Sequence, residues 1–100
     1  MALVLSLKIA EAFMVDGQRV VVSDVIDASE LTLELPSGKQ VTITEVEGTE
    51  ILPDVFVSAA GFYKWGQVRI AIEAPRSISI MREDRWNELQ RQRSKLDGVS

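Results

Sequence analysis

The chain has 100 residues, 46% of them hydrophobic, and its 11 basic and 15 acidic residues give a net charge of −4. This length and apolar content predict one domain with a hydrophobic core, and the acidic balance argues against a general nucleic-acid binder. Cysteine and histidine are absent, which excludes disulfides, thiol or imidazole nucleophiles and the usual zinc sites, so no metal is expected.

The first predicted element is a short apolar strand over residues 3–9. Ala10-Glu11-Ala12 follows it in the pattern of a signal-peptide cleavage site, but no positive charge precedes the apolar run and Lys8 interrupts it. The run is also far shorter than the roughly 20 residues that a membrane helix needs. We therefore expect a cytoplasmic protein with no membrane contact.

A tight hairpin is predicted next, because Asp16-Gly17 stands between the apolar runs 12–15 and 18–26. Aspartate and glycine both tolerate positive φ, which a two-residue hairpin turn requires. The stretch 19–26 is rich in valine and shows no clean alternation. Such a run is typical of a strand that is covered on both faces.

The middle segment, residues 27–65, carries the acidity of the chain. Its seven acidic residues and two lysines give it a charge of −5, so the remainder carries +1. Alternating apolar residues over 31–35 and 41–44 flank the polar loop 36–39 and predict a second hairpin.

A loop is expected over 45–54, which contains Gly48 and Pro53, and a further strand over 55–60. The glutamates of this loop are compatible with acid–base chemistry or a hard cation, but a solvated acidic face is the favoured interpretation. The sequence has no Gly-rich phosphate loop and no serine with a base beside it, so we expect neither an enzyme nor a cofactor.

Three of the six aromatic residues lie beside a lysine in Phe62-Tyr63-Lys64-Trp65. One interpretation is a platform on which unpaired bases stack, worth about 1–3 kcal/mol per base. The favoured interpretation is packing that ties the inserted hairpin to its parent sheet.

The stretch 66–84, GQVRIAIEAPRSISIMRED, contains two apolar alternations around a proline corner. A strand is predicted over 68–73 and a shorter one over 77–81, because Pro75 interrupts the ladder between them. Period two puts Arg82 on the side of Ile80, at the end of the sheet, where an arginine reaches solvent or holds an anion. A helix follows, with acidic residues in its first turn and basic residues in later turns.

The run 66–84 resembles the C-terminal half of the CsrA/RsmA carbon storage regulator family, and residues 3–15 are similar to its opening strand and turn. The resemblance covers about residues 3–26 and 66–93. It implies a mostly β fold: a CsrA-like core of about five short strands with a C-terminal helix, formed by residues 1–26 and 66–100. Residues 27–65 are then an inserted acidic β-hairpin region. It also implies a strand-exchanged homodimer.

The resemblance further implies an RNA-binding translational regulator that grips GGA-containing loops of mRNA leaders and blocks ribosome access, with regulatory small RNA as a second ligand. RNA then lies across the first strand of one chain and the last strand of the other. Carried over by position, Arg82 is the principal RNA-binding residue, Ile80 its apolar neighbour, and Leu5 the apolar residue of the first strand. Lys8 is the second member of a basic pair.

The sequence departs from the family pattern at three other positions. Leu7 stands where the family has the first basic residue of the pair, and Ala10 and Ala71 replace glycines. The lost cation and the acidic insert both weaken attraction to phosphate. RNA affinity is therefore expected to depend less steeply on salt, with the slope of log K against log salt concentration reduced by about 0.7 per lost phosphate contact.

Two further interpretations stay open. Arg82 has a structural alternative, a salt bridge with Glu83, Asp84 or the acidic insert, and Arg69 is expected to brace the sheet. The whole chain has a second possible role as a protein-interaction module or antagonist, which uses its acidic hairpin to contact a protein partner or to form mixed dimers with CsrA-type regulators.

Overall fold

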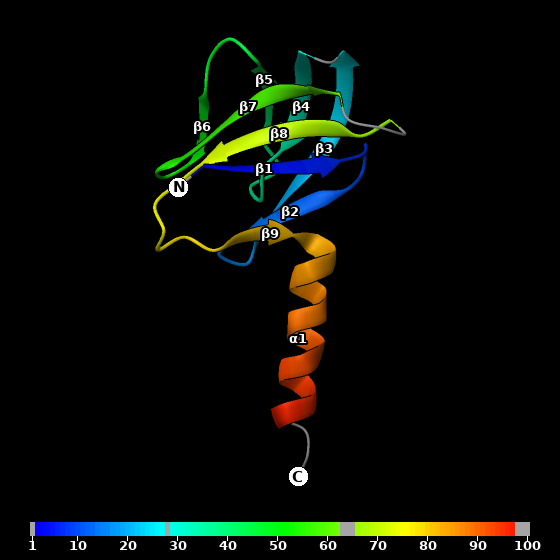
Figure 1. Ribbon diagram of the computed structural model, residues 1–100, viewed down its shortest axis with the longest axis vertical. Helices are drawn as coiled ribbons and strands as arrows, with labels where there is room; N and C mark the ends of the chain where they lie inside the picture. The colour runs from blue at the N-terminus through cyan, green and yellow to red at the C-terminus, as the bar shows by residue number, and fades with distance from the viewer. Residues whose placement is uncertain (1, 28, 63–65, 98–100) are drawn as a thin grey trace.

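The computed structural model describes residues 2–27, 29–62 and 66–97, except for the side chains of residues 62 and 94–97. Nine strands and one helix lie in this described part, in the chain order shown in Figure 1. They are β1 (Ala2–Leu7), β2 (Ala12–Val15), β3 (Gln18–Asp27), β4 (Glu30–Glu34), β5 (Gln40–Thr44), β6 (Thr49–Leu52), β7 (Val55–Phe62), β8 (Val68–Glu73), β9 (Ile80–Arg82) and α1 (Glu83–Asp97). The protein is therefore mostly β with a C-terminal helix, as predicted.

The strands form two antiparallel sheets that share one hydrophobic core. The first sheet has the order β1-β8-β7-β6 and the second the order β5-β4-β3-β2-β9. In strands such as β4 and β8 alternate residues are buried, which is the expected consequence of a two-residue period in a half-buried strand, whereas all four residues of β2 are buried. Fully buried examples are Leu7 and Ile70 in the first sheet and Phe13 and Leu33 in the second. The fold is a β-sandwich.

Both predicted hairpins are confirmed. Asp16 and Gly17 have φ of 49° and 82°, so the turn between β2 and β3 has positive φ at both central residues. The second hairpin pairs β4 with β5 in continuous register, from Glu30 opposite Thr44 to Glu34 opposite Gln40.

The segment 27–65 contributes to both sheets and to the common core. Strands β4 and β5 extend the second sheet, and β6 and β7 extend the first. Seven of the sixteen residues in the buried cluster come from this segment: Leu31, Leu33, Ile43, Ile51, Val55, Val57 and Ala59. The segment 27–65 is therefore built into the sandwich.

Three details differ from the sequence-based prediction. The region 45–54 is not entirely a loop, because β6 lies within it and buries Ile51 beside β7. The strand predicted over 77–81 begins only at Ile80, since the Ile78 N–H turns back to the Pro75 carbonyl at 3.0 Å. The strand β3 is covered on one face only, and Asp24 is exposed on its other face.

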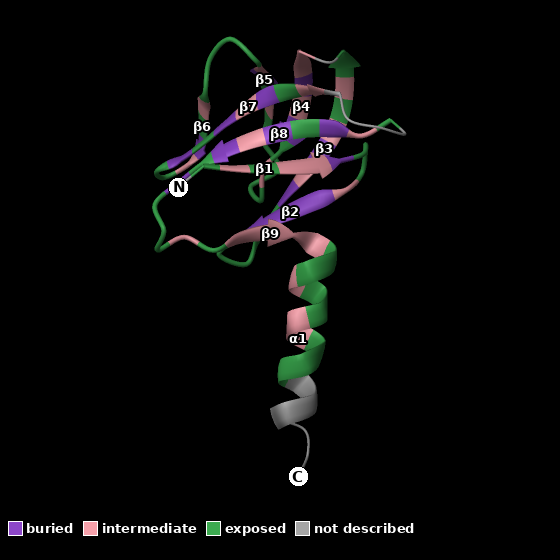
Figure 2. Cartoon of the chain, viewed as in Figure 1, coloured by how far each residue is buried: buried purple, intermediate pink, exposed green. Residues whose placement is uncertain are grey.

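The helix α1 projects away from the sandwich (Figure 1) and gives the molecule its longest dimension of 51 Å. Its first turns pack against β2 and β9, where Trp86 and Leu89 are half-buried. Much of the described remainder is exposed, as Figure 2 shows. In the described part of the chain, no helix is long and apolar enough to cross a membrane.

Candidate nucleic-acid interface

Two strand edges face one opening of the sandwich. Within the described residues β1 pairs on one side only, with β8, and β9 pairs on one side only, with β2. The two strands belong to different sheets, but the Arg82 guanidinium donates a hydrogen bond from Nη1 to the Ser6 carbonyl oxygen. The opening strand and the strand ending in Arg82 were expected to meet across two chains, whereas this contact joins them within one chain.

The edge of β1 presents unpaired backbone groups to this opening. Residues of an antiparallel pair alternate between exchanging both backbone hydrogen bonds and exchanging neither. The Ser6 carbonyl accepts from Arg82 and so points away from β8. The backbone groups of Val4, two residues earlier in the same register, have the same orientation. The Val4 N–H, the Val4 carbonyl and the Ser6 N–H thus point outward from the free edge of β1, away from β8.

The edge of β9 has the same property. The Asp16 N–H donates to the Ser79 carbonyl at 2.8 Å, and the register continues with Val15 opposite Ile80. Because Ser79 bonds toward β2, the next residue, Ile80, directs its N–H and carbonyl to the opposite side. Arg82 is two residues further along β9, so its backbone N–H also points away from β2. Both edges therefore offer donors and acceptors, with the Arg82 side chain between them.

Arg82 is held by three groups. Besides the Ser6 carbonyl, Nη2 lies 3.3 Å from Glu11 Oε2 and Nε lies 3.3 Å from Asp84 Oδ1. The Arg82 side chain is 31% exposed, so the guanidinium is accessible at the mouth of the opening. The expected pairing with Asp84 is present, while Glu83 instead binds Arg19 of β3.

Glu11 is a functional candidate that the sequence-based reasoning missed. One carboxylate oxygen accepts from the Lys8 N–H at 2.7 Å and the other faces Arg82. Lys8 itself is exposed directly after β1. The signal available in the sequence was the spacing of Lys8 and Glu11 across a turn, which brings a carboxylate back onto the end of the strand.

The two apolar site residues have a packing role. Leu5 and Ile80 are both partly buried against the common core. Leu7, at the position where the family pattern has a cation, is fully buried. The missing charge is therefore explained locally, since the side chain after Ser6 points into the sandwich and a cation there would lose its hydration.

Ala10 has a backbone conformation that favours glycine. Its φ is 75°, in the left-handed region that L-residues rarely adopt. The turn is fixed by hydrogen bonds from the Ala10 N–H to the Val22 carbonyl at 2.8 Å and from the Glu11 N–H to the Lys8 carbonyl at 3.0 Å.

A shallow pocket of about 210 Å³ lies next to Arg82 at the start of the helix. It is lined by Ala10, Glu11, Ala12, Arg82, Glu83, Asp84 and Asn87. Three carboxylates against one guanidinium make this pocket a poor phosphate site, so an anionic ligand would approach Arg82 from the strand edges. Within the described residues, no group of three or more acidic side chains is placed to hold a metal ion.

Neither a protein-family model, nor a curated protein, nor a solved structure matches this chain. The candidate interface is defined by its own residues. It combines free backbone donors and acceptors, one accessible guanidinium, and the exposed Lys8 at one end.

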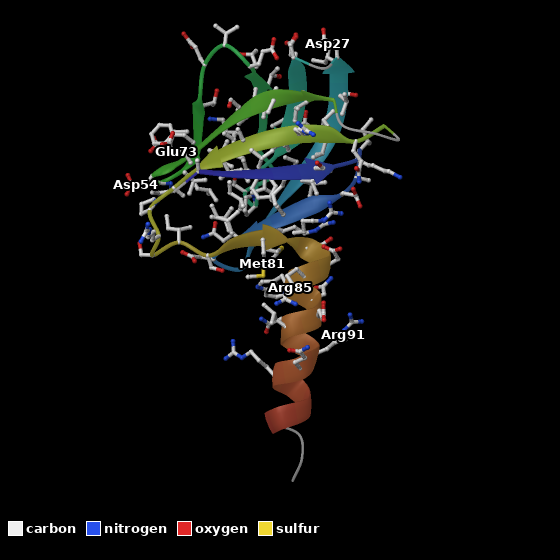
Figure 3. All side chains as sticks on the ribbon, in the orientation of Figure 1. Asp27, Asp54, Glu73, Met81, Arg85 and Arg91 are labelled. Atoms are coloured by element: carbon white, nitrogen blue, oxygen red, sulfur yellow. The ribbon has the colours of Figure 1, made fainter. Side chains whose placement is uncertain are left out.

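Three other arginines of the described residues lie away from these two edges. Arg85 and Arg91 are on α1, and the Arg91 side chain projects to the side of the helix (Figure 3). Arg85 lies 3.7 Å from Glu88 in the next turn. Arg69 is exposed on β8, the strand paired with β1. The aromatic segment 63–65 lies outside the described residues.

Proposed function

We propose that this protein binds single-stranded or looped RNA along the free edges of β1 and β9, and acts as a post-transcriptional regulator of the CsrA/RsmA type. The observation that carries the proposal is the Arg82 bridge to Ser6, which places a guanidinium between two unpaired strand edges. Backbone donors and acceptors at strand edges suit the exposed base edges of a looped RNA, while an arginine suits phosphate or a guanine base.

The expected ligand is a GGA-containing loop in an mRNA leader, and binding there would block ribosome access. The strand-exchanged homodimer and the cytoplasmic location remain predictions. The acidic surroundings of Arg82 support weaker binding than in a basic relative, because Glu11 and Asp84 compete with phosphate for the guanidinium.

The decisive experiment is a gel shift with a stem-loop RNA that presents GGA in its loop, at two stated salt concentrations. Arg82→Ala is expected to abolish the complex. Arg91→Ala is the matched control, because it removes the same charge from an exposed site on α1 and is expected to change affinity only slightly. Equal affinities of the two variants would show that Arg82 is not the RNA-binding residue.

A protein-interaction module is the second candidate function, and the outer face of the first sheet favours it. Val4 is 56% exposed and Phe56 is 43% exposed on this face. The small residue Ala71 of β8 lies opposite Val4 on one side and Ser58 of β7 on the other, and Ser58 is two residues from Phe56 in the same strand. Co-purification of a CsrA-type regulator that is lost on Phe56→Ser, with no RNA retained by either protein, would favour this function.

A further inference from the structure

A groove lies between the helix α1 and the turn that joins β2 to β3. It has a volume of about 580 Å³, within the range of pockets that hold ligands or side chains of a partner. Its apolar wall is formed by Met81, Trp86 and Leu89, each of them half-buried. Met81 is one residue from both Ile80 and Arg82, so its side chain is on the other face of β9. This helix groove is therefore separate from the candidate nucleic-acid interface.

The rim of the helix groove carries an exposed cation. Arg93 lines the groove, and it pairs with no carboxylate among the described residues. Asp16 is the one carboxylate among the described residues that line the groove, and its Oδ1 already accepts from the Ser79 N–H at 2.7 Å. The groove therefore suits an occupant that has an apolar side chain with a carboxylate beside it.

The loop between β5 and β6 has this chemistry. Val46 is 86% exposed, more than any other large hydrophobic residue of the described part. Glu45 and Glu47, on either side of it, are exposed as well. The Glu45 N–H donates to the Ser29 carbonyl at 3.1 Å, which holds the start of the loop in place. Residues 45–47, the acidic tip, thus present one apolar side chain between two carboxylates.

The acidic tip and the helix groove lie at opposite ends of the molecule. In Figure 1 the loop between β5 and β6 is at the top of the view, and α1 extends from the bottom of the sandwich, along an axis of 51 Å. The acidic tip therefore does not reach the groove of its own chain. A contact between tip and groove joins two copies head to tail, and such contacts continue into a ring or an open chain.

We infer that Val46 of one copy inserts into the helix groove of a second copy, with Glu45 and Glu47 placed against the second copy's Arg93. The contact is small, so it is weak and forms at high protein concentration. It uses neither β1 nor β9, so it is compatible with RNA binding and with the predicted strand-exchanged homodimer. The unit that assembles head to tail is whichever one, a single chain or a pair, exists in dilute solution.

Sedimentation equilibrium of the RNA-free protein tests this association, because it measures the weight-average mass at each protein concentration. The mass is expected to rise with concentration. Val46→Asp should weaken the association at least about tenfold, since a carboxylate would have to enter the apolar groove. Ile26→Asp is the matched control, because Ile26 is also exposed but lies near the end of β3, and it should leave the association unchanged. A constant mass in the unmodified protein, or equal loss in both variants, would overturn the inference.

Charge reversal identifies the two surfaces. One chain carries Glu45→Lys and Glu47→Lys, and the other carries Arg93→Glu, so like charges meet in every contact between identical chains. Each chain alone is expected to lose the association. An equimolar mixture should regain it, because tip and groove are then complementary in both directions. Arg91→Glu is the control for Arg93→Glu and should keep the association, since Arg91 is exposed on α1 but does not line the groove.

Two outcomes of the charge reversal would contradict the inference. Failure of the mixture to regain association would show that the acidic tip does not bind at Arg93. Association that Arg93→Glu abolishes and Val46→Asp leaves intact would mean that a different segment occupies the groove. Every variant changes only exposed residues, and its urea unfolding curve verifies that it is folded. None of these measurements contains RNA, so their outcome is independent of the proposed function.

Discussion

Arg82 of β9 and Ser6 of β1 lie in different sheets, yet the guanidinium of the first donates to the carbonyl of the second. The contact lies on the side of the sandwich where, among the described strands, β1 and β9 are the edge strands of the two sheets. A side chain that closes a sheet edge also reduces the tendency of that edge to pair with other chains. Arg82 therefore has a structural role, because it joins the two sheet edges, in addition to the RNA-binding role that we propose for it.

Replacement of Arg82 by lysine tests the geometry of this contact rather than its charge. Lysine keeps the positive charge, but it lacks the planar guanidinium fork. Its single ammonium therefore cannot contact the Ser6 carbonyl, Glu11 and Asp84 at the same time. RNA affinity is expected to fall by about tenfold, which corresponds to about 1.4 kcal/mol. Titration of a labelled GGA stem-loop measures it. Full affinity in Arg82→Lys would mean that charge alone matters at this position.

Replacement of Ala10 by glycine is expected to stabilise the protein. A left-handed φ costs a non-glycine residue roughly 1–2 kcal/mol. The greater freedom of glycine in the unfolded chain offsets roughly 0.5–1 kcal/mol of this gain. Ala10→Gly should therefore raise the free energy of unfolding by about 0.5–1 kcal/mol in urea titrations.

Ala71→Gly is the matched control for Ala10→Gly. Ala71 also stands where the family pattern has glycine, but it lies within β8, opposite Val4 and Ser58. Glycine in a strand interior is expected to destabilise by about 0.5–1 kcal/mol. Stabilisation by both substitutions, or by neither, would contradict the assignment of backbone strain to Ala10.

These two alanines show why the sequence alone settles only part of the fold. The hairpins were predictable because local chemistry determines them, as the positive φ of Asp16 and Gly17 illustrates. Whether alanine is strained at a given position depends on its backbone angle φ, and the hydrophobic periodicity of the sequence does not predict that angle. The same limit applies to β6, whose short sequence has no clear alternation and whose Ile51 is buried only through its neighbours in the fold.

The candidate site was likewise predictable in part. Arg82 was placed at the end of its strand from the two-residue period and the resemblance. Glu11 was missed, because its contact with Arg82 joins residues 71 positions apart and depends on how the two sheets meet. Long-range contacts of this kind are set by the packing of whole sheets, and the sequence pattern of either strand contains no sign of them.

Leu33→Ala tests whether the segment 27–65 shares one cooperative core with the rest. Leu33 is fully buried in β4, so truncation should cost about 2–5 kcal/mol. The free energy of opening measured by amide exchange should fall by the same amount in β1 and β8, in the other sheet, as in β4. Loss of protection confined to β4 and β5 would show instead that the hairpin unfolds on its own.

The carboxyl group of Asp27 gives a pH-dependent contribution to the turn between β3 and β4. Its pKa lies below the ordinary value of 3.8, first because the Ser29 hydroxyl donates to it and also because the Ser29 N–H does. A lowered pKa in the folded state means that this stabilisation is fully present above pH 3.8 and is lost as the pH falls through the folded pKa. Ser29→Ala should move the Asp27 pKa back toward 3.8, as measured by carboxyl carbon chemical shifts. An unchanged pKa in this variant would rule out the hydroxyl as the main cause.

Neutralisation of Glu11 is expected to strengthen RNA binding, because this carboxylate faces Arg82 at 3.3 Å and competes with the ligand for it. The Glu11 side chain is 39% exposed, so its attraction for Arg82 is screened and worth at most about 1 kcal/mol. Glu11→Gln should therefore raise affinity for the GGA stem-loop by up to about fivefold.

The matched control is Glu47→Gln, which makes the same change of net charge at an exposed position between β5 and β6. If only the overall charge mattered, both variants would gain equally, and the gain would vanish at high salt. A gain in Glu11→Gln that exceeds the control and disappears in the double variant with Arg82→Ala would assign the effect to the Glu11–Arg82 pair. Weaker binding in Glu11→Gln would mean that Glu11 positions Arg82 for RNA rather than competing with it.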